Sequence, residues 1–379
     1  MPNPTIWARE PHTEVKHNIY DGYLDAWFPI ILRGFGSATY AEGYAGPGVY
    51  LDDKPGSPLR ALDRLRNVRR QHGSQVATAP VRFVLIDKRR DRVDSLRRQF
   101  EAALGAALPG GWYHDQQLTV LIRRGDCEQD LPEALAEVGA WNSPILAVLD
   151  SFGGGCSREL LTLLAQNRAG EVLTTVEPQH FVRELDPERA DRVFGTTTWR
   201  DVDRQPAERK RTFIVEQLDA ATRDAGFRHV VRFGLHTNTG GELVLQFGTN
   251  NVRGLERFKD SLWNADPVAG AGFRDPNDPD QMTLDMQLEP NLGPLRRILH
   301  GHLSDLPART ATLNQLRQFT LEHTIFKATH TVPALEDLRA RQQIETTPHQ
   351  KRIHHQTGRT TRITARPAHD DLFGSWSAG

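Results

Sequence analysis

The sequence predicts an α/β protein in which helices cover a mostly parallel β-sheet and a smaller α+β unit follows. The first observation is a set of short runs rich in Val, Ile and Leu, as buried parallel strands are, with helical patterns between them. These runs span residues 81–87, 118–126, 143–150 and 170–176. The second observation is a turn signal, Asn238 to Gly241, between two β-like runs, which predicts a hairpin.

The chain opens with a predicted helix, a strand and a glycine-rich loop. Residues 13–34 place apolar side chains at three- and four-residue steps, which predicts a helix with one apolar face. A short apolar stretch then runs into the loop EGYAGPG at residues 42–48. Leucines at three-residue steps indicate a second helix near residues 57–70.

Acidic residues stand at the carboxyl ends of four predicted strands, namely Glu42, Asp87, Asp126 and Asp150. In an open parallel sheet these ends line the crevice where ligands bind. We therefore expect the four carboxylates to converge on one edge of the sheet. Because Asp is also a good helix N-cap, capping is an alternative role for each Asp at a strand-to-helix junction.

The hairpin distinguishes between two nucleotide-binding architectures. A helical pattern from residue 206 leads into the two β-like runs of the hairpin. A terminal hairpin is typical of a Rossmann-like, seven-stranded methyltransferase sheet rather than of a six-stranded dinucleotide-binding sheet. We place this domain at residues 1–265.

The C-terminal part is expected to be a separate domain. Residues 266–294 are dense in Pro, Gly, Asp and Asn, which predicts an irregular connection. Residues 295–366 carry three helical patterns and two short β-like runs, the element order of a winged helix, and residues 367–379 form a tail. The helices should pack through Leu313, Leu316, Phe319, Leu335 and Leu338.

Composition and charge exclude several classes of protein. The 47 Lys and Arg residues balance 48 Asp and Glu residues, so no chain-wide attraction draws the protein to nucleic acid or acidic lipid. The two cysteines, Cys127 and Cys156, lack metal-ligand spacing, and we expect no metal site. Without a signal-peptide pattern or an 18-residue apolar window, we expect a cytoplasmic protein that has no membrane contact. The sequence makes no prediction of oligomeric state.

The glycine-rich loop suits close approach of a ligand, because Gly lets the backbone reach atoms that a Cβ would block. It is neither the GxGxxG fingerprint nor a P-loop, since no GK[ST] follows. Asp87 would accept from the ribose hydroxyls of a nucleoside ligand, and Asp126 from an adenine amino group. A tight turn without a ligand is the alternative.

The segment Asp150-Ser151-Phe152-Gly153 resembles the [DN]PPY-type element of amino-methyltransferases. In that element oxygen atoms hold an exocyclic NH2 group while the aromatic ring stacks on the base. A nitrogen conjugated into a base is a weak nucleophile, so aligning its lone pair with the methyl donor is the main catalytic task. A plain glycine-rich turn is the alternative.

Several longer segments together resemble the three-Cys-motif partner (TcmP) family. They are HTEVK from His12, GYAGPG from Gly43, GSPL from Gly56, DSFG from Asp150 and GLERFKDSLWNADPVAGAGF from Gly254. The front half is also similar to ribosomal RNA adenine-N6 methyltransferases of the RlmJ kind. The family commonly has Asp where this chain has Glu42, which keeps the charge, and Pro where it has Ser151.

This resemblance implies a methyltransferase that uses S-adenosylmethionine, with a three-Cys-motif protein as a candidate partner. It implies catalytic roles for Asp150 and Phe152, and we place His12, Lys16 and Gly153 on the substrate side. The cofactor contacts are expected around the glycine-rich loop and after the next two strands, at Glu42, Gly43, Tyr44, Ala45, Gly46, Gly48, Ser57, Asp87, Lys88, Asp126 and Cys127.

Three functions stay open on the sequence alone. The first is methylation of an amino group of a nucleic-acid base, the second is methylation of a small molecule or peptide, and the third is a catalytically silent binding protein. Residues 346–369 are basic and contain no Asp or Glu, which favours nucleic-acid contact, although a solvated tail would have the same composition. The basic side chains expected to contact phosphates are Arg339, Arg341, Lys351, Arg352, Arg359 and Arg362.

Overall fold

A computed structural model of the chain describes residues 4–151, 154–183, 186–236, 242–265, 290–348, 353 and 361–366. The described residues form two compact units, one on each side of the segment 266–289, and we describe each unit by itself. Phe152 and Gly153 lie outside the described residues, as do the hairpin turn and most of the basic stretch near the C-terminus.

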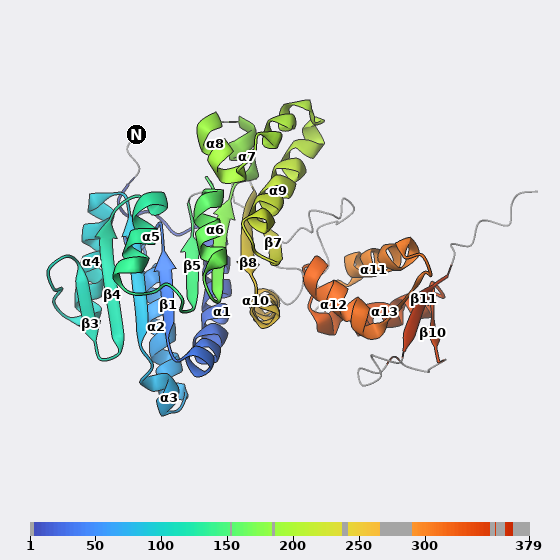
Figure 1. The fold of residues 1–379 in the computed structure, drawn as a ribbon, viewed down its shortest axis with the longest axis horizontal. Coiled ribbons are helices and arrows are strands. Elements are labelled where there is room, and N and C mark those ends of the chain that lie inside the picture. The colour runs from blue at the N-terminus through green and yellow to red at the C-terminus, as the bar shows by residue number, and fades with distance from the viewer. Residues whose placement is uncertain are drawn as a thin grey trace, which may run out of the picture. The chain divides into compact units, whose positions relative to one another are not determined.

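The first unit contains one large, mostly parallel sheet, which confirms the predicted α/β class (Figure 1). The strand order is β3-β4-β2-β1-β5-β6-β8-β7. Strands β3 and β8 run against the other six, and β7, which pairs antiparallel with β8, runs in the direction of the parallel strands. The strands are β1 (Ala38–Glu42), β2 (Val81–Asp87), β3 (Trp112–Asp115), β4 (Leu118–Arg124), β5 (Ile145–Leu149), β6 (Gly170–Val176), β7 (His229–His236) and β8 (Glu242–Thr249).

The sheet has eight strands, so the predicted count of seven is wrong. The additional strand is β3, whose four residues pair with β4 at the edge of the sheet. This short edge strand is buried only in part, and its sequence WYHD contains no apolar run. The pattern that predicts a buried strand is therefore missing. The buried strands β2 and β6 coincide with the predicted runs 81–87 and 170–176.

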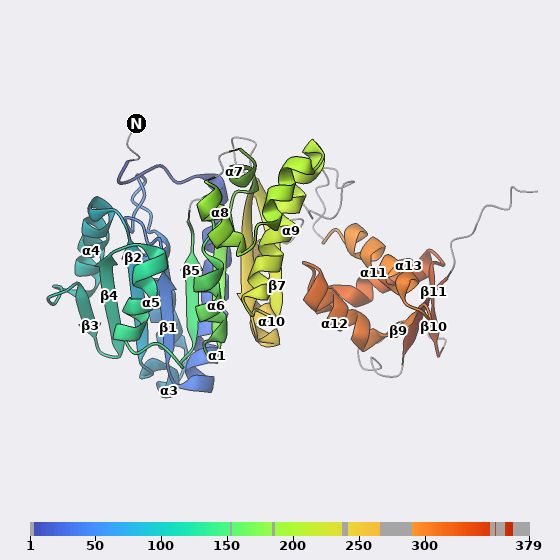
Figure 2. The same ribbon diagram turned by 45° about the horizontal axis from the view of Figure 1, so that its top comes forward.

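Helices cover both faces of the sheet, with α5 and α6 in front and α1 behind in Figure 2. Two short helices and a 3-10 turn, which the sequence analysis did not predict, lie between β6 and α9. The helices of this unit are α1 (Pro11–Phe35), α2 (Ser57–Gln71), α3 (Ser74–Ala77), α4 (Arg90–Leu104), α5 (Cys127–Glu137), α6 (Arg158–Gln166), α7 (Pro178–Arg183), α8 (Pro187–Phe194), η1 (Thr198–Arg204), α9 (Ala207–Asp224) and α10 (Val252–Ala265).

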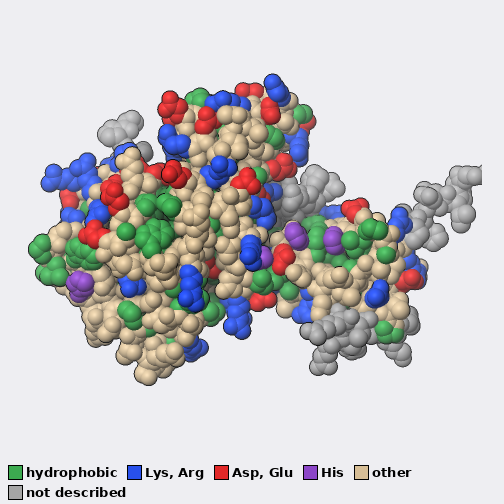
Figure 3. All heavy atoms as spheres, viewed as in Figure 1, with side chains coloured by type: hydrophobic (Ala, Val, Ile, Leu, Met, Phe, Trp, Pro, Cys, Tyr) green, Lys and Arg blue, Asp and Glu red, His purple; other side chains and the backbone are tan. Residues whose placement is uncertain are grey.

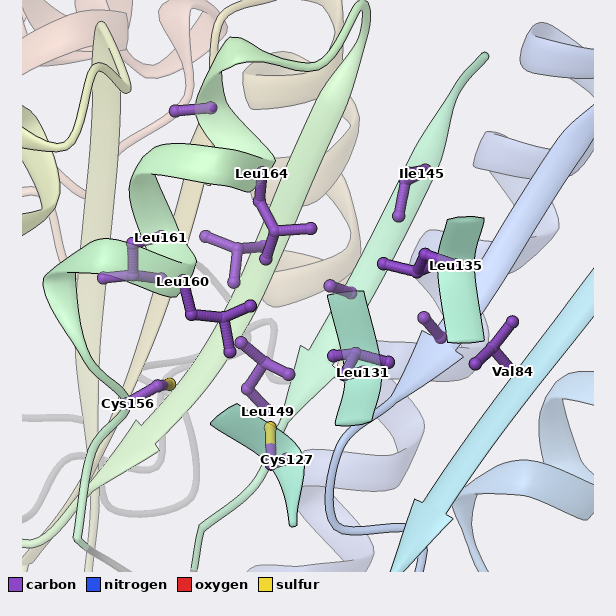
Figure 4. Packing of buried hydrophobic residues seen from close by; sticks show 14 of the residues in the cluster. Val84, Cys127, Leu131, Leu135, Ile145, Leu149, Cys156, Leu160, Leu161 and Leu164 are labelled. Carbon is purple, nitrogen blue, oxygen red and sulfur yellow. The ribbon is translucent and has the colours of Figure 1, made fainter. Parts of the chain in front are cut away.

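The core on the α5 and α6 side is built from aliphatic side chains (Figure 4). Leu131 of α5 and Leu160 of α6 meet the strand residue Leu149, and all three are buried. Burying one such side chain stabilises a fold by about 1.5 to 3 kcal/mol. This packing fixes the carboxyl end of β5, after which Asp150 follows.

On the opposite face an aromatic cluster holds α1 and α10 to the sheet. The rings of Phe247 on β8 and Phe258 on α10 stack at 4.2 Å, and Tyr23 of α1 meets both edge-on. The Tyr23 hydroxyl donates to Oε2 of the buried Glu171 at 2.7 Å, and the Thr249 hydroxyl donates to Oε1 at 2.8 Å. Helix α1 is therefore fixed to the sheet by packing and by a buried hydrogen bond.

The second unit combines three helices with a three-stranded antiparallel sheet of order β10-β11-β9. Leu313, Leu316, Leu335 and Leu338 are buried as expected, whereas Phe319 is only half-buried and stacks on His302 at 3.7 Å. Its elements are α11 (Gly293–Asp305), β9 (Thr310–Thr312), α12 (Leu313–His323), η2 (Ala328–His330), α13 (Thr331–Ala340), β10 (Ile344–Thr347) and β11 (Arg362–Ala365).

Among the described helices, none has the length and apolar character that crossing a bilayer requires.

The hydrogen bond to Glu171 generates a stability prediction. Tyr23→Phe keeps the aromatic packing but removes one donor from a buried carboxyl group, so the free energy of unfolding should fall by about 1 to 3 kcal/mol. Urea denaturation measures the change. The matched control is Tyr113→Phe, since the Tyr113 hydroxyl donates only to a backbone carbonyl at 3.3 Å and should cost less. Equal losses in the two variants would contradict the role of Glu171.

Candidate functional site

A cavity of about 400 Å³ lies where the loop after β1, the first turns of α1 and the end of β5 meet. In an open α/β sheet the carboxyl ends of the strands are where ligands bind. Eight predicted site residues line this cavity: the cofactor residues Tyr44, Ala45, Gly46, Gly48 and Ser57, the substrate-side residues His12 and Lys16, and the catalytic residue Asp150.

The glycine-rich loop is held in one conformation by its neighbours. Gly46 and Gly48 have φ angles of 66° and 80°, in the left-handed region that a residue with a Cβ seldom adopts. The Gly46 N–H donates to Oδ2 of Asp87 at 2.9 Å, and the Ala45 N–H donates to the Ile86 carbonyl at 2.8 Å. Asp87 thus anchors the loop to the end of β2, and its other oxygen accepts from the Arg89 N–H at 2.8 Å.

Asp150 is fixed through both of its carboxylate oxygens. Oδ2 accepts from Nζ of Lys16, and Oδ1 accepts from the hydroxyl of Thr175 on β6. The side chain of Lys16 is 9% exposed and that of Asp150 is 27% exposed, so the ion pair faces the cavity from a largely buried position. Helix α1, which precedes the sheet in the chain, therefore supplies the cation for the acid that follows β5.

The charges of this pair set the protonation of the groups around it. Burial acts to raise the pKa of Asp150, but the charge of Lys16 and the hydrogen bonds from Lys16 and Thr175 together lower it. Burial and the charge of Lys16 lower the pKa of His12. The cavity thus presents a carboxylate that stays ionised at neutral pH.

Glu42 lies beneath the loop and not in the cavity wall. Its oxygens accept from the hydroxyls of Tyr40 and Ser57, the latter at 2.8 Å, and the side chain is buried. Burial raises the pKa of Glu42 to about 8, and the charge of Asp150 contributes in the same direction. The expectation that Glu42 keeps a negative charge is therefore not met near neutral pH, because a buried carboxyl group next to another acid holds its proton.

The remaining predicted cofactor residues have structural contacts outside the cavity. A Cβ on Gly43 would lie 2.1 Å from Sγ of the buried Cys127, so Gly43 is where β1 and α5 touch. Asp126 caps α5 through the Glu128 N–H at 3.0 Å and pairs with Lys88 at 3.2 Å. Their contact with a cofactor stays a prediction, as do the roles of Phe152 and Gly153, which lie outside the described residues.

Sequence reasoning missed the N-terminal segment that closes one side of the cavity. Trp7 lines the cavity beside Gly46, and the Arg92 guanidinium lies over its ring at 4.7 Å from the centroid. Trp7 also meets Tyr50, another wall residue, edge-on at 6.0 Å. No local pattern identifies such a contact, because its partners are far apart in the sequence.

Two buried polar atoms near the ion pair have no partner among the residues that the structure describes, and the first of them, on His17, was also missed. His17 follows Lys16, lines the cavity and is 2% exposed, and its Nδ1 is unpaired while Nε2 lies 3.4 Å from the Tyr50 hydroxyl. Burial and the charge of Lys16 lower the pKa of His17 to about 3, so its ring is neutral. The second atom is the hydroxyl oxygen of Ser151. Buried polar groups are normally hydrogen-bonded, so the Nδ1 atom of His17, which lines the cavity, is available to a ligand.

Within the described parts of the chain, no group of three or more His, Cys, Asp or Glu residues is arranged to hold a metal ion.

No protein-family model and no curated protein matches the sequence. Solved structures resemble the fold. Trm1 from Pyrococcus horikoshii with S-adenosyl-L-methionine is 11% identical over 68% of this chain and 61% of that chain, with a TM-score of 0.38. The O-methyltransferase from Bacillus cereus in complex with SAH is 11% identical over 61% of this chain and 80% of that chain, with a TM-score of 0.31. This chain thus spans less than two thirds of the Trm1 chain, and similarity at this level does not identify a function.

The protonation of Glu42 predicts how stability depends on pH. The pKa of Glu42 is about 8 in the folded chain against 4.5 for the free group. Protonated Glu42 therefore stabilises the fold fully below about pH 4.5, and this stabilisation is lost as the pH rises through 8. Glu42→Gln keeps an uncharged side chain of the same shape and does not titrate. Between pH 5 and pH 8 the wild type should therefore lose about 1 to 3 kcal/mol of unfolding free energy relative to the variant.

Urea denaturation of both proteins across this range measures the difference. Parallel curves for wild type and Glu42→Gln would show that Glu42 is ionised throughout.

Proposed function

We propose that this protein is an S-adenosylmethionine-dependent methyltransferase that methylates an exocyclic amino group of a nucleic-acid base. One observation carries the proposal. The glycine-rich loop after β1 and the fixed carboxylate after β5 line the same cavity, so a site for a methyl donor adjoins a group that can orient an amine. The resemblance of the longer sequence segments to the TcmP family and to RlmJ-type enzymes is consistent with this function.

The residues around the loop fit the cofactor. Gly46 exposes its backbone to the cavity without a side chain, and Ser57 and the neutral His17 add polar groups to the wall. Asp87 does not itself line the cavity but holds the loop through the Gly46 N–H, and a contact of its carboxylate with ribose hydroxyls is part of the proposal. The cofactor would supply an activated methyl group, and the two similar solved structures named above were determined with S-adenosyl-L-methionine and with SAH.

Asp150 is suited to hold the methyl acceptor. A carboxylate that is ionised and held at both oxygens can accept a hydrogen bond from an amino group without moving itself. That bond orients the nitrogen lone pair, which is the demanding part of methylating a base amine.

The second unit has the element order helix, strand, helix, helix, strand, strand, and we propose that it is a winged helix that binds the nucleic acid. A three-Cys-motif protein is the alternative partner. Among the basic residues foreseen for phosphate contact, Arg339 pairs with Glu336 and Arg341 with Asp337, so these two guanidinium groups already have carboxylate partners.

The cofactor assignment predicts that Gly46→Val abolishes binding of S-adenosylhomocysteine. Valine cannot easily adopt the φ of 66°, and its side chain would occupy the wall of the cavity. Isothermal titration calorimetry measures the affinity, and circular dichroism checks the fold. The matched control is Gly73→Val, since nothing lies within 4 Å of a Cβ there and Gly73 has a φ of −64°. Wild-type affinity in Gly46→Val would overturn the assignment.

The catalytic assignment predicts that Asp150→Asn lowers kcat by about a hundredfold or more, while the affinity for S-adenosylhomocysteine stays unchanged, because removing one transition-state hydrogen bond typically costs that much. Tritiated methyl transfer to total RNA, DNA and small-molecule extract identifies the acceptor class. Asp224→Asn is the control, since Asp224 is exposed near the end of α9 and does not line the cavity. Wild-type turnover in Asp150→Asn, or transfer only to the small-molecule extract, would contradict the proposal.

A further inference from the structure

The first turn of α1 brings a second ionisable side chain to the cavity, beside the ion pair. His12 and Lys16 lie four residues apart, so they share one side of the helix, and both line the cavity with Asp150. The side chain of His12 is 17% exposed. The hydrogen bonds that hold Asp150 come from Lys16 and Thr175, so they do not occupy the ring of His12.

The two nitrogen atoms of the His12 ring have different surroundings. Nδ1 is buried and lies 3.6 Å from Oε2 of Glu10. A carboxylate on this side favours the tautomer that carries its proton on Nδ1. Nε2 then keeps its lone pair and is the ring nitrogen that is left to the cavity.

Four charged side chains act on the ring of His12. Burial has the largest effect on the pKa of His12 and lowers it, and the charge of Lys16 acts in the same direction. The carboxylates of Glu10, of Asp150 after β5 and of Glu177 after β6 act in the opposite direction. The ring is therefore mostly neutral at pH 7, and three carboxylates would stabilise the imidazolium that forms when it takes up a proton.

These charges belong to the cavity and its rim. Glu177 follows β6 directly and lines the cavity, as Glu10 and Asp150 do. Basic and acidic side chains are interspersed on the face of the molecule drawn in Figure 3, in keeping with the formal net charge of −1. The charge of that face is mixed in sign, so its long-range effect on the cavity is small.

Methylation of an amino group requires an acceptor for a proton. The nitrogen uses its lone pair to form the bond to carbon, while the S–C bond breaks and its electron pair stays on the sulfur. The nitrogen then carries a positive charge, which it loses when one N–H proton leaves and the electrons of that bond return to the nitrogen. A base that is already positioned in the cavity makes this proton transfer direct.

We propose that Nε2 of His12 accepts this proton and is the general base of the methyl transfer. An exocyclic amino group has two N–H bonds, and Asp150 and His12 line the same cavity and can accept one hydrogen bond each. Holding both N–H bonds restricts the direction of the nitrogen lone pair, which is the alignment that methyl transfer requires. The inference deepens the proposed function and rests on it, because it assigns a base to the same reaction.

Other groups of the cavity wall are less suited to take the proton. The pKa of Asp150 is lowered overall despite its burial, because Lys16 and Thr175 stabilise the carboxylate. Burial lowers the pKa of His17 to about 3, so that ring is too weak a base. Glutamate carboxylates are ordinarily weaker bases than imidazole, which disfavours the two glutamates of the wall.

The first test measures tritiated methyl transfer from S-adenosylmethionine to total RNA and to DNA. His12→Asn keeps a polar side chain but cannot take up a proton, so the rate should fall about a hundredfold or more. The affinity for S-adenosylhomocysteine, measured by calorimetry, should stay near that of the wild type. The matched control is His114→Asn, since His114 is exposed on the edge strand β3 and does not line the cavity. Equal rates in wild type and His12→Asn would overturn the proposal.

The dependence of the rate on pH distinguishes a base from a structural residue. The wild-type rate should fall as the pH drops through the pKa of His12, below the ordinary value of 6.5, and should be level above it. Glu177→Gln removes a charge that raises this pKa, so the inflection should move to lower pH. Added imidazole should restore part of the activity of His12→Ala and none to Asp150→Asn. An inflection that persists unchanged in His12→Asn would overturn the proposal.

A measurement without turnover separates the base from the methyl transfer itself. Nitrogen-15 NMR of labelled histidine in the full-length protein, with S-adenosylhomocysteine bound, reports the protonation and tautomer of each ring. The signal that His12→Asn removes should show a neutral ring with its proton on Nδ1 at pH 7. A charged ring, or a proton on Nε2, would overturn the base even where methyl transfer occurs. A wild type that methylates neither RNA nor DNA overturns the proposed function, and the role of His12 with it.

Discussion

The ion pair between Lys16 and Asp150 is the interaction on which the site depends. It joins a helix that precedes the sheet to the residue that follows β5, and Thr175 on the next strand holds the same carboxylate. A largely buried charge without its partner destabilises a fold by several kcal/mol, so neither residue can be removed without cost to the other. The aromatic and hydrogen-bonded contacts of Tyr23 on the same helix keep Lys16 at this position.

The parts of the fold that the sequence predicts are those with local signals. The runs that became β2 and β6 are buried and apolar throughout, so their composition alone distinguishes them. Strand β3 has no such run, and its pairing with β4 depends on a neighbour across the turn. The helices α7 and α8 were not predicted for a similar reason. Each is too short to show a long amphipathic pattern, and their residues Phe181 and Phe194 are buried against each other.

The residues of the candidate site also fall into two groups, those with a local signal in the sequence and those without one. The loop glycines and Asp150 could be identified because strand ends and glycine spacing are visible in the sequence, and the structure places them around one cavity. Thr175, His17 and Trp7 could not, since each matters through a partner that lies far away in the chain or across the sheet. The charge of Glu42 was misjudged because burial, which decides its pKa, is a property of the folded chain.

The contact between Gly43 and Cys127 limits how this chain could change over evolutionary time. A methyl group at position 43 would overlap the sulfur of Cys127, so alanine is admissible there only after position 127 has become smaller. A shorter residue at position 127, in turn, leaves a void beside Leu149 that glycine at position 43 does not fill. The two positions should thus substitute together or not at all, which makes them an epistatic pair joining β1 to α5.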